Sequence, residues 1–168
     1  FQLTQIGGTL SVDGQVVSGT QAIFLAYMRH PDLTPVMNEA LRFSQQGMTT
    51  IFGLAGASLA FYHTAKPEKK MMAKAILLPA IITSMLTGIT EPIEFTFLFV
   101  SPLLWVIHAT LTAASQAICD IFTVRPWGAS GLIEFLIYNL PLPVSLTRWP
   151  GYVLIGIGQF AVYYVIFR

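Results

Sequence analysis

The sequence predicts an all-α transmembrane fold of helical spans and re-entrant hairpins, with a small extracytoplasmic β-hairpin near the N-terminus. Of its 168 residues, 54% are hydrophobic and only 10% are charged, whereas soluble domains are about 25% charged. All four lysines fall within residues 66–74, and from Ala75 to Cys119 the only formal charges are two carboxylates. Long apolar runs with so few charges are typical of membrane-embedded chains.

Residues 1–46 are more polar and are expected to form an extracytoplasmic loop, distinct from a membrane part at residues 47–168. Residues 9–19, TLSVDGQVVSG, predict a β-hairpin with Asp13 and Gly14 at its turn. A short helix is expected in QAIFLAYMRH, before a segment broken by proline. We expect this loop on the side of the membrane opposite the lysines.

The membrane part begins with residues 47–64, an apolar segment rich in small residues that suit close helix packing in lipid. Its length is marginal for a span, which needs about 20 residues. The lysines follow directly, and because cytoplasmic loops collect Lys and Arg, we expect this turn in the cytoplasm. The alternative is a solvated linker or helix cap of a soluble protein.

Residues 71–122 form one long apolar stretch that is broken at Gly88 to Pro92. Proline lacks an N–H and disfavours helix at the residue before it, so Glu91 is expected to be extended and the first helix to end near Gly88. A new helix is expected from Pro92. Non-helical backbone at membrane depth is tolerated only where it is buried in protein or lines a cavity, and transporters place such breaks at substrate sites.

The remaining residues predict a broken or re-entrant element at 125–150 and a last span at 151–167. Prolines and an asparagine interrupt the first of these. Arg148 and Trp149 precede the last span and Arg168 follows it, as is common at membrane interfaces. Asp120 and Arg125, at the end of the preceding span, are expected to form a surface pair of little energetic weight.

Glu91 and Glu94, three residues apart in the apolar stretch, have two interpretations. An acidic side chain at the membrane centre costs about 2.5–3.5 kcal/mol, so both need a partner. They either cap the broken backbone or pair with Arg or His, or they form a polar site for a polyhydroxyl ligand, since carboxylates accept hydrogen bonds well. His108 is either a buried, hydrogen-bonded structural residue or a ligand. Glu134, also beside a break, is either structural or faces the ligand path.

The sequence also resembles a known family. Residues 88–105, GITEPIEFTFLFVSPLLW, are similar to the signature of the membrane-embedded IIC component of bacterial sugar phosphotransferase systems, in the glucose, maltose and N-acetylglucosamine group. Four further segments resemble other parts of that domain, and the resemblance covers nearly the whole chain. They are GGTLSVDGQVVSG, RFSQQG, FYHTAKPE and VYYVIFR.

The resemblance implies that the chain binds a sugar in the membrane and presents its C6 hydroxyl to a phosphorylated cysteine of a IIB domain. Glu91 matches the motif glutamate that binds the sugar near the reacting oxygen, where it could also assist proton removal. Glu94 matches the second acid. The implied sugar-binding residues are Gly88, Ile89, Thr90, Glu91, Pro92, Glu94 and His108.

The family also implies partners and a location. The partners are a sugar of the glucose or maltose class, the IIB domain, the lipid bilayer and, when the domain is complete, a second copy. The location is the bacterial cytoplasmic membrane, crossed several times. The chain is expected to be a C-terminal fragment of the domain, inactive by itself as a sugar phosphotransferase. Cys119 is expected to be a packing residue, because its surroundings do not resemble the IIB motif.

No metal or cofactor is implied, and the net charge of +1 gives no indication of nucleic-acid binding. The residues alone leave a second function class open. This is a secondary transporter that uses Glu91 as a proton-linked intramembrane site.

Overall fold

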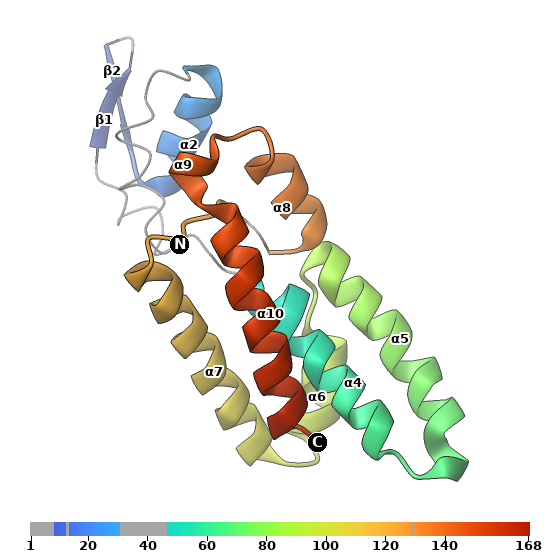
Figure 1. Cartoon of the computed structure of the whole chain (residues 1–168). Helices are drawn as coiled ribbons and strands as arrows, with labels where there is room; N and C mark the ends of the chain where they lie inside the picture. The colour runs from blue at the N-terminus through green and yellow to red at the C-terminus, as the bar shows by residue number, and fades with distance from the viewer. Residues whose placement is uncertain (1–8, 13, 31–46, 129) are drawn as a thin grey trace.

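The computed structural model of the chain describes residues 9–12, 14–30, 47–128 and 130–168, and Figure 1 shows the arrangement of its elements. The described part is mostly helical, as predicted, with one two-stranded sheet. The elements in chain order are β1 (Thr9–Val12), β2 (Gln15–Ser18), α2 (Thr20–Arg29), the π-helix η2 (Thr49–Gly53), α4 (Leu54–Thr64), the 3₁₀-helix η3 (Pro67–Lys69), α5 (Lys70–Thr87), α6 (Glu91–Leu98), α7 (Pro102–Ile121), α8 (Leu132–Asn139), α9 (Val144–Thr147) and α10 (Trp149–Ile166).

Within the described residues, three helical segments are long and apolar enough to cross a membrane: Pro67–Thr87, Pro102–Ile121 and Trp149–Ile166. Large apolar side chains such as Leu103 and Leu154 remain exposed on their outer faces. Such faces are expected where the solvent is lipid rather than water. The sequence prediction of membrane helices is therefore confirmed, whereas η2 and α4 together form a shorter segment.

The predicted hairpin is present. Strands β1 and β2 pair antiparallel with Val12 opposite Gln15, which leaves a two-residue turn. Gly14 occupies that turn with φ +77°, a conformation that glycine adopts at little cost. The expected helix after the hairpin is α2. The proposed division at residue 46 falls outside the described residues.

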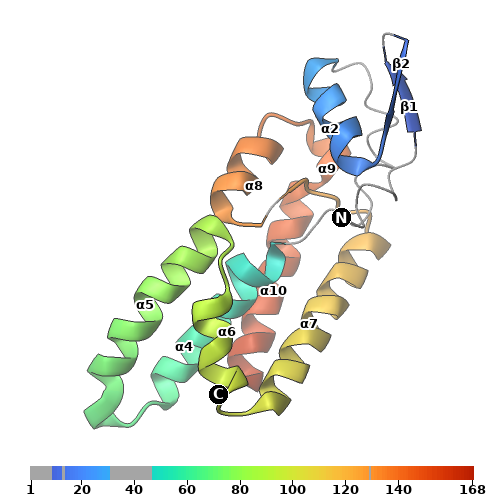
Figure 2. The same ribbon diagram turned by 180° about the vertical axis from the view of Figure 1, so that it is seen from behind.

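The two ends of the bundle differ in composition. Figures 1 and 2 place the lysine-bearing turn between α4 and α5, the α6–α7 link and the C-terminus at one end. The hairpin, α2, α8 and α9 lie at the other end. The polar hairpin region and the lysine turn are therefore at opposite ends of the molecule. Their placement on opposite sides of a membrane stays a prediction.

Helices α4 and α10 pack closely because small residues let their backbones approach. A Cβ atom built on Gly56 would lie 2.3 Å from the backbone oxygen of Phe160. Beside it, Tyr163 is buried and stacks on Phe167, with ring centroids 5.3 Å apart. The close contact between Gly56 and Phe160 holds helix α4 to α10, the last helix of the chain.

Changing Gly56 to Ala is expected to destabilise the bundle by about 1–3 kcal/mol, the usual cost of overpacking. Gly158→Ala is the matched control, because a Cβ at Gly158 meets nothing within 4 Å. Thermal unfolding in detergent measures both. Equal melting temperatures for the two variants would contradict the packing described for α4 and α10.

The break between α5 and α6 lies where the sequence places it. Helix α5 ends at Gly88, whose φ is +82°, and the Gly88 N–H donates to the Ser84 carbonyl at 2.8 Å. The expectation of an extended Glu91 is wrong, because Glu91 is the first residue of α6. Pro92 follows in the first turn, where its missing N–H needs no partner, so the non-helical link is confined to residues 88–90.

A second break, at residues 99–101, was not predicted. Ser101 is extended, with φ −152° and ψ 98°, and Pro102 starts α7. The expected interruption at 125–150 is confirmed as the short helices α8 and α9. Asn139 fixes the chain there, since its side chain bonds the backbone N–H and carbonyl of Trp127 at 2.7 and 2.9 Å.

Candidate functional site

A polar cavity of about 260 Å³ lies where the two interrupted regions of the chain meet. It combines a carboxylate, an imidazole and several hydroxyls within an otherwise apolar bundle. Its lining residues are Thr49, Thr50, Gly88, Thr90, Glu94, His108, Thr112 and Ser130. They come from η2, the α5–α6 break, α6, α7 and the loop before α8.

The π-helix η2 supplies one wall of this cavity. Thr50 Oγ1 donates to the Gly47 carbonyl at 2.7 Å and also to the Ser130 carbonyl. Ser84 Oγ donates to the Thr50 carbonyl at 3.1 Å. These bonds join η2 to α5 and to the loop before α8. Short π-helical segments are frequent at functional sites.

Two interruptions of the helices meet at the cavity: the link between α5 and α6 at residues 88–90, and the loop before α8. These two helix breaks pack directly on each other through glycines. A Cβ on Gly88 would lie 2.6 Å from the Ser130 carbonyl oxygen, and a Cβ on Gly131 would lie 2.5 Å from the Leu86 carbonyl oxygen. Glu134 serves this junction, because its Oε2 accepts a hydrogen bond from the Ser130 N–H at 3.2 Å. Its structural interpretation is therefore supported.

The side chains of Glu94 and His108 lie next to each other in the lining of the cavity. Glu94 Oε1 lies 3.6 Å from His108 Nε2, and the two side chains are 24% and 10% exposed. His108 Nδ1 lies 3.1 Å from the hydroxyl of Tyr163. His108 is therefore buried and hydrogen-bonded, as its structural interpretation expects, and it lines the cavity, while a role in ligand binding stays a prediction.

Hydrogen bonds connect the cavity-lining Thr49 and Thr112 with two further polar side chains, Ser115 and Gln159. Thr49 Oγ1 bonds Thr112 Oγ1 at 3.1 Å, and Gln159 Nε2 donates to Thr49 at 2.9 Å and to Ser115 Oγ at 3.0 Å. Sequence reasoning missed these residues and Thr50. Their signal is weak, because isolated hydroxyls and amides in apolar helices also bond their own helix backbone.

Four of the seven predicted site residues line the cavity: Gly88, Thr90, Glu94 and His108. The other three, Ile89, Glu91 and Pro92, are exposed and lie outside its lining. Glu91 directly follows cavity-lining Thr90 and has no side-chain hydrogen bond or ion pair within the described residues. The second acid of the motif, rather than the first, is thus the one inside the cavity.

This arrangement suits a neutral, hydroxyl-rich ligand. The carboxylate accepts hydrogen bonds, the hydroxyls of Thr49, Thr50 and Thr90 both donate and accept, and the imidazole can do either. Few convergent polar groups in an apolar setting are typical of small-molecule sites. The described residues contain no group of three or more His, Cys, Asp or Glu that could hold a metal ion.

Two other expectations concern residues away from the cavity. Cys119 is buried in a cluster with Met48 and Tyr152, in agreement with its predicted packing role. Asp120 and Arg125 form the expected pair, 3.8 Å apart, but Arg125 is buried rather than at the surface. The backbone N–H of Arg125 donates to the backbone carbonyl of Thr147 at 2.9 Å. This bond ties Arg125 to the last residue of α9.

Comparisons with known proteins identify the family of this chain. The family described as "Phosphotransferase system, EIIC" matches residues 1–113. The maltose-specific EIICB component of Escherichia coli is 39% identical over 171 residues, which cover 100% of this chain and 32% of that protein. The glucose-specific EIICBA component of Staphylococcus carnosus is 38% identical over 98% of this chain and 24% of its own length.

A third relative, the maltose-specific EIICB component of Bacillus subtilis, is 42% identical over 75% of this chain and 24% of its own length. The chain thus spans about a third or less of these curated relatives. The family match over residues 1–113, together with three helices long and apolar enough to cross a bilayer, shows that this chain belongs to the integral membrane EIIC family of the phosphotransferase system.

Proposed function

We propose that this chain is the sugar-binding, C-terminal part of a IIC membrane domain, in a permease for maltose or glucose of the bacterial cytoplasmic membrane. The observation that carries the proposal is the polar cavity at the junction of two helix breaks, inside an apolar bundle. Relatives named as maltose- and glucose-specific components support the substrate class.

In this proposal the sugar lies against residues 88–94. Gly88, Ile89, Thr90 and Pro92 shape the re-entrant tip, while Glu94 and His108 bind sugar hydroxyls within the cavity. Glu91 binds the C6 hydroxyl at the edge of the site and accepts its proton as the oxygen attacks phosphorus. The phosphorus–sulfur bond of the IIB phosphocysteine breaks, and the cysteine leaves as thiolate.

The remaining features belong to the complete protein. The names EIICB and EIICBA of the relatives support a IIB partner. We propose that the rest of the IIC domain completes the sugar site and forms a homodimer, and that this chain alone does not phosphorylate sugar. The lysine turn then faces the cytoplasm, where IIB docks, and the hairpin faces the opposite side.

Uptake by cells that express the full-length protein tests the proposal. Sugar should accumulate inside as its phosphate, and accumulation should require phosphoenolpyruvate. The second candidate is a secondary transporter, in which Glu91 would serve as a proton-linked site within the membrane. Accumulation of free sugar that depends on the proton gradient would establish that alternative and exclude the phosphotransferase mechanism.

A further inference from the structure

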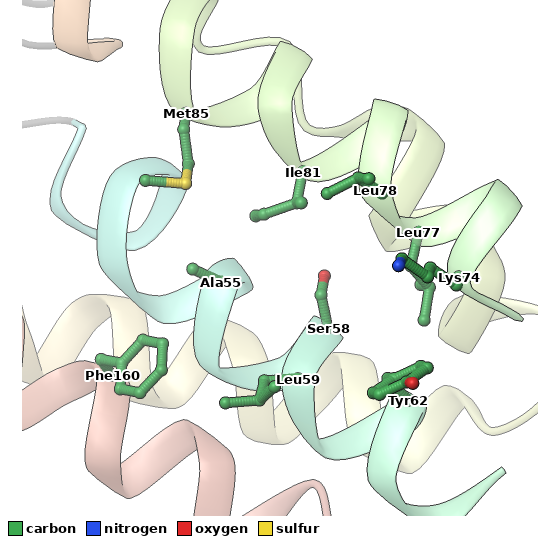
Figure 3. Close-up of a pocket in the computed structure, with 10 residues that line it drawn as sticks. All are labelled: Ala55, Ser58, Leu59, Tyr62, Lys74, Leu77, Leu78, Ile81, Met85 and Phe160. Carbon is green, nitrogen blue, oxygen red and sulfur yellow. The ribbon is translucent and has the colours of Figure 1, made fainter. Parts of the chain in front are cut away.

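A groove of about 440 Å³ runs between α4 and α5 and shares no lining residue with the polar cavity (Figure 3). Its walls are almost entirely apolar. The lining residues are Ala55, Ser58, Leu59, Tyr62, Lys74, Leu77, Leu78, Ile81, Met85 and Phe160. Helix α5 belongs to a candidate span, Pro67–Thr87, so the groove extends along the membrane-crossing direction.

Ser58 places an unpartnered hydroxyl in this groove. The residue is 5% exposed, and its Oγ has no hydrogen-bond partner among the residues that the structure describes. Figure 3 shows that oxygen directed from α4 into the space facing α5. A serine inside a helix usually bonds the carbonyl four residues earlier, and buried hydroxyls are rarely left unpaired. The Ser58 hydroxyl can therefore donate to an acceptor of a bound ligand at this depth.

Lys74 lines the groove toward its end near the α4–α5 turn, together with Tyr62. No carboxylate of the described residues lies within ion-pair distance of Lys74. The other lysines, Lys66, Lys69 and Lys70, precede it in the α4–α5 turn and at the start of α5. A long lysine side chain can cover apolar surface with its stem while its amine reaches the membrane interface. The groove thus has a cationic end and an apolar interior.

We propose that the α4–α5 groove binds one anionic glycerophospholipid. Its phosphate pairs with Lys74, an ester carbonyl accepts the hydrogen bond from Ser58, and one acyl chain lies along Leu77, Ile81 and Met85. Charge complementarity carries this choice, because basic pockets between membrane helices on the lysine-rich side match the anionic headgroups of the cytoplasmic leaflet. The inference does not rest on sugar transport.

Lipid binding to the full-length protein tests this site. The delipidated protein is titrated with phosphatidylglycerol or phosphatidylcholine, and bound lipid is counted by native mass spectrometry. We expect phosphatidylglycerol to bind more tightly. Lys74→Gln should weaken it at least about tenfold, as loss of a hydrogen bond to a charged group does, and Ser58→Ala about fivefold.

Lys66→Gln is the matched control, because it removes the same charge from the nearby α4–α5 turn, and Lys66 does not line the groove. Its effect should stay below about threefold, since attraction between separated exposed charges is screened. Equal effects of Lys74→Gln and Lys66→Gln, or equal binding of the two lipids, would overturn the proposal. So would a structure of the full-length protein with a protein segment or a second copy in the groove.

Discussion

Glu91→Gln in the full-length protein is expected to lower the rate of sugar phosphorylation by more than about 100-fold, because general base catalysis contributes about 10²–10⁴-fold. Glutamine keeps the size and a hydrogen-bond acceptor but cannot take the proton of the C6 hydroxyl. Glu91 is exposed and has no side-chain partner within the described residues. The melting temperature of the variant should therefore match that of the wild type. The assay measures phosphoenolpyruvate-dependent formation of sugar phosphate in membrane vesicles.

Glu134→Gln is the matched control for this experiment. Glu134 is also an acid beside a helix break, but it accepts a hydrogen bond from the Ser130 N–H, and a glutamine oxygen can do the same. Its activity should stay within about threefold of wild type, since the glutamine oxygen can keep this part-buried hydrogen bond. A similar rate for Glu91→Gln and wild type would show that another group accepts the proton.

Gly88→Ala is expected to destabilise the protein by about 2–5 kcal/mol and to abolish sugar binding. Two costs add at this position. The left-handed backbone, φ +82°, costs a non-glycine residue about 1–2 kcal/mol. The new Cβ would also lie 2.6 Å from the Ser130 carbonyl oxygen, and overpacking costs about 1–3 kcal/mol. Thermal unfolding in detergent and sugar titration measure the two effects.

Two other glycines separate these costs. Gly14 has φ +77° with nothing within 4 Å of a built Cβ, so Gly14→Ala carries the backbone cost alone. Gly131, with φ −141°, carries the close contact alone, because its Cβ would lie 2.5 Å from the Leu86 carbonyl oxygen. If Gly88→Ala were no worse than Gly14→Ala, the two breaks would not pack together as described.

Much of the fold could be predicted from local sequence signals. The membrane helices follow from long apolar runs, and the hairpin from Asp13-Gly14 between two strand-forming segments. The end of α5 follows from Gly88, because few other residues adopt the left-handed conformation. The break before Pro102 was missed although that proline marks it. Apolar residues on both sides concealed the interruption.

The cavity was harder to predict, because it depends on contacts between distant segments. The sequence drew attention to Glu91 as the motif glutamate, yet Glu94 is the acid that faces His108. Both acids lie in the first turn of α6, so the difference between them comes from tertiary contacts, since only Glu94 reaches His108 on α7. Thr50 and Ser130 are 80 positions apart, and no local pattern brings them together.

The central claim is that a sugar binds against the junction of the two helix breaks. A structure of the full-length protein with bound maltose or glucose tests it most directly. The account predicts sugar hydroxyls within hydrogen-bonding distance of Glu91 and of at least one of Glu94 and His108, with the ring beside residues 88–90. A sugar bound elsewhere, with the Glu91 side chain against lipid, would contradict it.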